Sequence, residues 1–153
     1  MNSEVLNLDE FLNEDEQKSQ IISFPYGIVG FEECENFALY RIKNERFKGL
    51  VALESMDIKN LRFIAIPVNI ITMKELQLLK DEDMQELIDV TGTKERDFLF
   101  LYLVTIQDSQ LFFNQRAPIV IDASNKHGMQ IILDVSYPLS VDIRTLTNVN
   151  LGK

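Results

Sequence analysis

The sequence predicts a mainly β protein with a single-domain, antiparallel, β-barrel-like fold and one short helix. Short apolar stretches rich in β-branched residues recur along its 153 residues, and polar turn residues separate them. Only one stretch combines helical spacing with helix-capping residues. Because about eight short strands would leave exposed edges in an open sheet, we expect the sheet to close into a barrel.

The first strands are predicted from apolar patterning and from the turns between them. Residues 21–24 form a short strand that Pro25 stops, and two glycines make residues 25–30 a turn. Further strands are expected at residues 37–42, 49–54 and 61–67, with Pro67 ending the last, and residues 68–74 could continue as an edge strand.

The helix is predicted to begin at Asp81 and to end at Gly92. Acidic residues 82 and 83 occupy its first turn, where the helix dipole favours them, and Met84, Leu87 and Ile88 share one face. Residues 98–106 form the longest apolar run and are interpreted as a central strand. A buried helix is the alternative, although no capping pattern marks its ends.

Two more strands and a turn are predicted near the C-terminus. Residues 117–122 alternate in the manner of a strand, and residues 129–133 repeat the pattern. Pro118 cannot donate to a ladder, so we expect it at an edge, at a bulge or where its strand begins. Gly128 closes the polar loop 123–127, and we expect a positive φ at this glycine, which would adopt it at little cost.

Three segments are expected along the chain: an acidic N-terminal segment (1–20), a β-barrel-like domain (21–143) and a C-terminal tail (144–153). In the first segment Val5, Leu8 and Leu12 would share one face if the segment were a helix. The chain after Tyr137 is interpreted as a last strand or a tail. We expect a monomer when free.

The net charge of −9 argues against direct nucleic-acid binding, which needs clustered Lys and Arg, and suits a basic protein partner. The apolar runs are too short to span a bilayer, and no signal peptide is recognised, so we expect a cytoplasmic protein without membrane contact. The single cysteine, Cys34, cannot form an internal disulfide.

No catalytic, cofactor or metal site is predicted. His127, the one histidine, lies in a polar turn without apolar flanks that would tune it as a base. Cys34 lies among glutamates, whose negative charge disfavours the reactive thiolate instead of activating the thiol. The imidazole and thiolate ligands of a zinc site are too few, and no phosphate-binding glycine loop is present.

Six residues are candidates for partner binding. Phe31, Glu32 and Glu33 are the candidates on the N-terminal side. Glu32 and Glu33 belong to an acidic patch that also includes Glu35, although a solvated turn is the plainer interpretation. Arg116 could pair with a carboxylate inside the fold or reach out to a partner. The candidates on the C-terminal side are Phe112, whose neighbour Phe113 must face the other side of a strand, Asn114 and Arg116.

Two separated stretches resemble the flagellar assembly factor family, FliW. One is Asn114-Gln115-Arg116-Ala117-Pro118-Ile119-Val120-Ile121, followed by Gly128, Gln130, Leu133 and Tyr137. The other is Ser23-Phe24-Pro25-Tyr26-Gly27-Ile28-Val29-Gly30-Phe31-Glu32. The chain departs from the family at Val29, where a second proline is frequent, at Gln115, and in having no tryptophan.

The resemblance implies a protein that binds the RNA-binding translational repressor CsrA, relieves repression of flagellin synthesis, and also binds flagellin. It implies a site on CsrA away from the RNA-binding surface, and a strand within the N-terminal segment instead of a helix. A small barrel that binds an apolar ligand or performs unrecognised chemistry is the competing class. A third class is a structural subunit that associates with itself.

Overall fold

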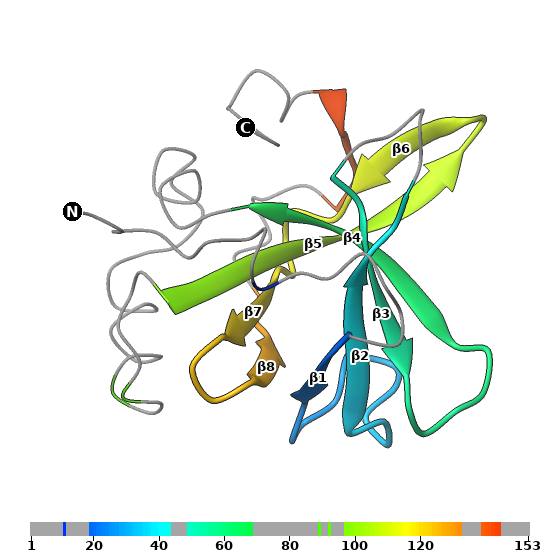
Figure 1. Ribbon diagram of the computed structural model, residues 1–153. Coiled ribbons are helices and arrows are strands. Elements are labelled where there is room, and N and C mark those ends of the chain that lie inside the picture. The colour runs from blue at the N-terminus through cyan, green and yellow to red at the C-terminus, as the bar shows by residue number, and fades with distance from the viewer. Residues whose placement is uncertain are drawn as a thin grey trace.

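The computed structural model describes residues 11, 19–43, 49–68, 89, 92, 97–132 and 139–144. Within these residues the chain forms nine strands (Figure 1). They are β1 (Gln20–Ser23), β2 (Asn36–Arg41), β3 (Val51–Ser55), β4 (Arg62–Val68), β5 (Phe98–Gln107), β6 (Gln110–Phe113), β7 (Ile119–Asp122), β8 (His127–Gln130) and β9 (Val141–Asp142).

Seven of these strands close into a barrel. They follow the order β4-β3-β2-β1-β8-β7-β5, and β4 also pairs with β5, which completes the ring. All pairings are antiparallel except that of β1 with β8, which consists of the single pair Ser23 and His127. Closure removes the edges that an open sheet would expose, and the predicted fold class is confirmed.

Strand β5 is the central strand of the fold. Its first half pairs with β4 on one side and with β7 on the other. Its outer half forms a hairpin with β6, which projects from the barrel in Figure 1 and carries β9 on its other edge. The prediction of a central strand at residues 98–106 is therefore confirmed, and the alternative of a buried helix is wrong.

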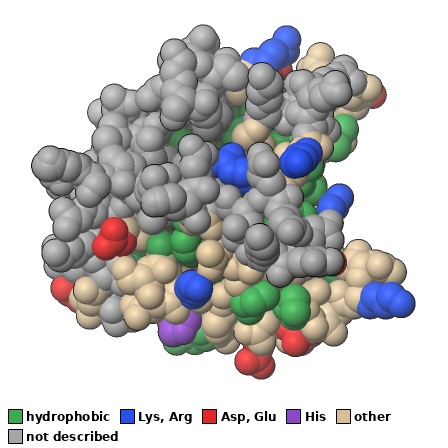
Figure 2. All heavy atoms as spheres, in the orientation of Figure 1, with side chains coloured by type: hydrophobic (Ala, Val, Ile, Leu, Met, Phe, Trp, Pro, Cys, Tyr) green, Lys and Arg blue, Asp and Glu red, His purple; other side chains and the backbone are tan. Residues whose placement is uncertain are grey.

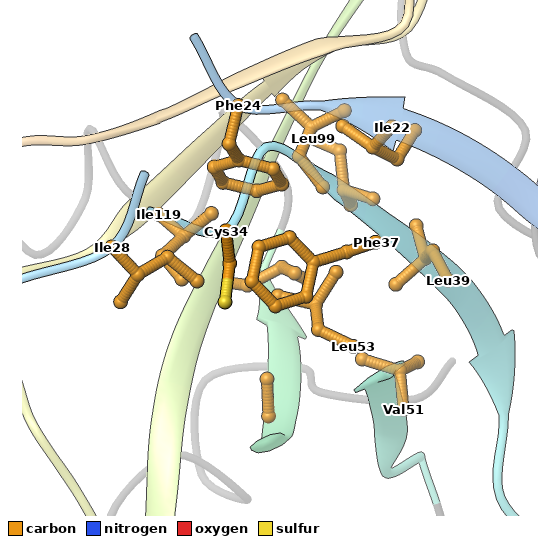
Figure 3. Packing of buried hydrophobic residues seen from close by; sticks show 13 residues of the cluster. Ile22, Phe24, Ile28, Cys34, Phe37, Leu39, Val51, Leu53, Leu99 and Ile119 are labelled. Atoms are coloured by element: carbon orange, nitrogen blue, oxygen red, sulfur yellow. The ribbon is translucent and has the colours of Figure 1, made fainter. Parts of the chain in front are cut away.

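Two hydrophobic cores lie on opposite faces of β5, because side chains alternate along a strand. The interior core fills the barrel with side chains from β1, β2, β3, β4, β5, β7 and the loop after β1 (Figure 3). The outer core covers the other face and includes Phe98, Phe100, Tyr102, Leu111, Phe113 and Val120. Because residues 98–102 of β5 are buried on both faces, this part of the strand is a continuous apolar run.

Several predicted boundaries need correction. Pro67 does not end β4, because Val68 still pairs with Phe100. The strand tolerates the proline because β3 pairs with β4 only as far as Ala65, so that Pro67 has a ladder partner on one side alone. Pro118 lies directly before β7, one of its three predicted positions.

The loop before β8 also differs from the prediction. The positive φ falls at Lys126, at 57°, and not at Gly128. Strand β8 begins at His127, two residues before the predicted start. Gly128 is required for another reason, which is that the ring of the buried Phe24 lies against its backbone.

Other predictions lie outside the described residues. They are the helix beginning at Asp81, the edge strand at 68–74 after its first residue, and most of the N-terminal segment and the tail. The three-part division of the chain therefore stays a prediction. Phe11 is half-buried and packs against the interior core.

Candidate partner-binding surfaces

The loop between β1 and β2 contains the first motif and folds as a series of tight turns. The amide of Gly27 donates to the carbonyl of Phe24 at 2.9 Å, and the amide of Phe31 donates to that of Ile28 at 2.6 Å. Gly27 has a φ of 67°, and a β-carbon there would lie 2.5 Å from the Cα of Glu32. The loop therefore needs glycine at this position for both its conformation and its close packing.

The three candidates in this loop have different environments. Phe31 is half-buried, and its ring packs edge-on against Phe63 with centroids 5.2 Å apart. Glu32 and Glu33 are exposed, and Glu32 Oε2 accepts a hydrogen bond from the Gly30 amide at 3.2 Å. Phe31 is thus partly a structural residue, whereas the side chain of Glu33 is accessible to a partner.

The loop between β3 and β4 is hydrogen-bonded to the loop between β1 and β2. Asp57 Oδ2 accepts hydrogen bonds from the amides of Glu35 at 2.8 Å and Asn36 at 3.0 Å. The buried Ser55 accepts hydrogen bonds at Oγ from the amides of Asp57 and Ile58. Sequence reasoning missed Asp57, although a serine two residues before an aspartate is a signal for such a turn.

The second motif begins in the turn between β6 and β7. Asn114 Oδ1 accepts hydrogen bonds from the amides of Arg116 at 2.9 Å and Ala117 at 3.3 Å. The amide of Asn114 itself donates to the carbonyl of Leu103 on β5. Asn114 therefore shapes the turn that presents Arg116, which is half-buried. Whether Arg116 acts inside the fold or toward a partner stays a prediction.

The adjacent phenylalanines on β6 face opposite sides, as expected. Phe113 is buried and stacks on Tyr102 with ring centroids 4.7 Å apart. Phe112 is half-buried and lies opposite Asp142 of β9. Hydrogen bonds from Arg144 lower the pKa of Asp142 to about 2, so this carboxylate beside Phe112 is charged at neutral pH.

Gln130 joins the two motifs, although they are far apart in sequence. Its Oε1 accepts a hydrogen bond from the Val29 amide at 2.9 Å, and its Nε2 donates to the Ala117 carbonyl at 3.3 Å. The loop containing Phe31 and the turn containing Arg116 are thus brought to the same side chain. Phe112, farther along β6, is not part of this junction. Gln130 was not predicted as a site residue. The one signal in the sequence that could have identified it is its place in the second motif.

Reactive side chains are sparse in the described part of the chain. Cys34 is buried in the interior core, and His127 is exposed at the start of β8. Among the described residues no three His, Cys, Asp or Glu side chains are grouped so that they would hold a metal ion. No helix within the described ranges is long and apolar enough to cross a bilayer.

The comparisons with known proteins agree on one family. The family model described as FliW protein matches residues 7–143. A flagellar assembly factor FliW from Clostridium botulinum is 32% identical over 142 residues, which cover 88% of this chain and 95% of that protein. One from Leptospira interrogans is 33% identical and covers 74% of each chain.

A solved structure supports the same assignment. A crystal structure of the flagellar assembly factor FliW superposes with a TM-score of 0.60 and 25% sequence identity, and it covers 80% of this chain and 84% of the other. The closed barrel, the two motifs joined by Gln130 and these matches lead to one conclusion. This chain belongs to the FliW family of flagellar assembly factors.

Proposed function

We propose that this protein is a non-enzymatic regulator that acts in the cytoplasm, binds the translational repressor CsrA and so relieves repression of flagellin synthesis. We propose that it also binds flagellin, so that free flagellin determines how much of the factor is available to CsrA. The observation that carries the proposal is the match of the FliW family model to residues 7–143. Relatives that cover most of the chain bear the name flagellar assembly factor.

The charge of the molecule supports a basic protein as the partner. The net charge is −9, and Glu32, Glu33 and Glu35 are exposed on one loop. A protein that binds RNA carries clustered Lys and Arg for the phosphates. Opposite charges speed the encounter of two proteins, so binding to CsrA should be fast and should weaken with added salt. RNA itself should be repelled.

The packing of the barrel interior supports a protein that binds partners at its surface and not a ligand inside the barrel. Side chains from β1, β2, β3, β4, β5 and β7 meet there, and Phe24, Phe37 and Leu53 are fully buried (Figure 3). Barrels that hold a ligand keep a cavity for it, whereas this interior is occupied by its own hydrophobic side chains. This packing favours a binding protein over a ligand-carrying barrel.

A gel-shift experiment tests the proposal. The protein is added to a preformed complex of CsrA with RNA from a flagellin leader. We expect the RNA to be released, with no band that contains RNA and this protein alone. Persistence of the CsrA–RNA band at saturating protein, together with no heat of CsrA binding at low salt, would overturn the assignment.

Two further measurements complete the test. Purified flagellin, titrated into the mixture, should bind the factor and restore the CsrA–RNA band; failure to bind flagellin would remove that half of the proposal. Light scattering of the free protein should give the mass of a monomer, and a stable larger assembly would favour a structural subunit instead. Substituting the candidate residues one at a time then tests which of them contribute to partner binding. They are Phe31, Glu32, Glu33, Phe112, Asn114 and Arg116.

A further inference from the structure

Large apolar side chains are exposed together on the two loops at one end of the barrel. The β1–β2 loop exposes Tyr26 (77%) and Val29 (63%), and the β3–β4 loop exposes Met56 (59%) and Ile58. Within the described residues these are four of the eight large hydrophobic side chains that are exposed. Single exposed apolar residues are ordinary, but several on adjoining loops indicate an interaction surface.

Exposed acidic side chains lie on one of the same loops as this apolar set. Glu33 and Glu35 are exposed on the β1–β2 loop. Figure 2 shows hydrophobic and acidic side chains next to one another at the lower end of the molecule, where the β1–β2 and β3–β4 loops lie in Figure 1. We call Tyr26, Val29, Met56, Ile58, Glu33 and Glu35 the loop-end surface.

The loops that carry this surface are held in place by hydrogen bonds. The Met56 amide donates to the carbonyl of Asn36 at 2.9 Å, and the Asp57 carboxylate accepts from the amides of Glu35 and Asn36. The β1–β2 loop is also held by Gln130, whose Oε1 accepts a hydrogen bond from the Val29 amide. A surface that is already ordered loses little conformational entropy when a partner binds. These loops are therefore suited to binding with their apolar side chains outward.

We propose that the repressor docks on the loop-end surface through a segment in which Lys or Arg side chains flank apolar anchors. The inference rests on the proposed function, and it commits to the repressor because charge complementarity selects a basic partner over another acidic surface. Tyr26 and Met56 supply the apolar contact that slows dissociation. Glu33 and Glu35 supply the charge that speeds association.

The apolar contact is tested with Met56→Ser and Val29→Ser. Titration calorimetry with the organism's own CsrA should show binding weakened at least about tenfold by one or both variants, as for anchors at the centre of an interface. Ile106→Ser is the matched control. Ile106 is also exposed, at 67%, but it lies on the β5–β6 hairpin at the other end of the molecule in Figure 1, and its substitution should leave the affinity unchanged.

The charge is tested with the double variant Glu33→Gln and Glu35→Gln. Its association rate with CsrA, measured by stopped flow, should be several-fold lower than that of the wild type at low salt and similar to it at high salt. Asp108→Asn is the control, because Asp108 is exposed on the hairpin and its loss removes a charge elsewhere. That variant should change the association rate less than the double variant does.

Each outcome decides a different point. If the wild type does not bind CsrA, the proposed function falls and this inference falls with it. If the wild type binds and the loop-end variants bind equally well, only the inference is overturned. An equal loss in Ile106→Ser would show that the loss is not specific to the loop-end surface and would overturn the inference too. Melting curves confirm folding, and Tyr26→Ser replaces any variant that does not fold.

Discussion

The aromatic ring of Phe24 occupies the space that a side chain at position 128 would need. A β-carbon built on Gly128 would lie 2.4 Å from Cζ of Phe24, and two further ring carbons would lie within 2.8 Å. Phe24 is fully buried in the interior core and packs edge-on against Phe37 with centroids 5.2 Å apart. The ring therefore has little room to move, and strand β8 passes it only because residue 128 has no side chain.

Gly128→Ala should lower the free energy of unfolding by about 1–3 kcal/mol, because the added methyl group overfills a packed core. Urea denaturation of the two proteins measures the difference. In a Phe24→Leu background the same substitution should cost less, since the smaller side chain leaves space at that position. Equal costs in the two backgrounds would show that the contact with Phe24 is not the cause.

Phe100→Ala should destabilise the protein by about 3–5 kcal/mol, because it leaves a cavity in the outer core. Phe100 is fully buried on β5, where that strand is paired on both sides. Ile106→Ala on the same strand is the control and should change stability by less than about 0.5 kcal/mol, since the side chain is exposed. Rapid amide exchange throughout residues 98–103 of the native protein would contradict the assignment of a central strand.

Tyr40 links three neighbouring strands and should make stability sensitive to alkaline pH. Its hydroxyl donates a hydrogen bond to Glu54 Oε1 at 2.7 Å and accepts one from Arg62 Nη1 at 3.2 Å. Burial, above all, raises the pKa of the Tyr40 hydroxyl from 10.0; the Arg62 hydrogen bond opposes this rise and Glu54 adds to it. The folded protein therefore keeps this proton at pH values where the unfolded chain has lost it.

The stabilisation from Tyr40 is accordingly complete below the pKa of the unfolded chain, 10.0, and is lost as the pH rises through the higher folded pKa. Urea unfolding between pH 9 and pH 11 measures the decline. Tyr40→Phe removes the ionising group, so its stability should fall less over this range. A parallel decline in both proteins would assign the effect to other groups.

Asn114→Ala should lower stability by about 0.5–1.5 kcal/mol for each hydrogen bond that is not replaced by water. The substitution removes the acceptor for the amides of Arg116 and Ala117. Asn114→Asp keeps that acceptor and serves as the control. If thermal melting shows no difference between Asn114→Ala and the wild type, then the turn between β6 and β7 is held by other contacts.

Much of the secondary structure could be predicted from local pattern. The continuous apolar run around Phe100 and the alternation after Pro118 both mark strands, because burial and side-chain direction repeat within a few residues. Among the candidate residues, the exposure of Glu32 and Glu33 and the opposite facing of Phe112 and Phe113 were likewise local properties. The two family motifs were recognised for the same reason.

What the sequence determined by itself was therefore the strands, the motifs and the acidic character, all of which depend on near neighbours or on composition. Tertiary structure decided the closure of β4 on β5 and the exposure of Tyr26 and Met56, whose residue types are equally common in cores. It also decided why residue 128 is glycine and why Gln130 binds Val29, a residue 101 positions away. Such contacts exist only once distant segments are brought together, and no local pattern encodes which atoms will then meet.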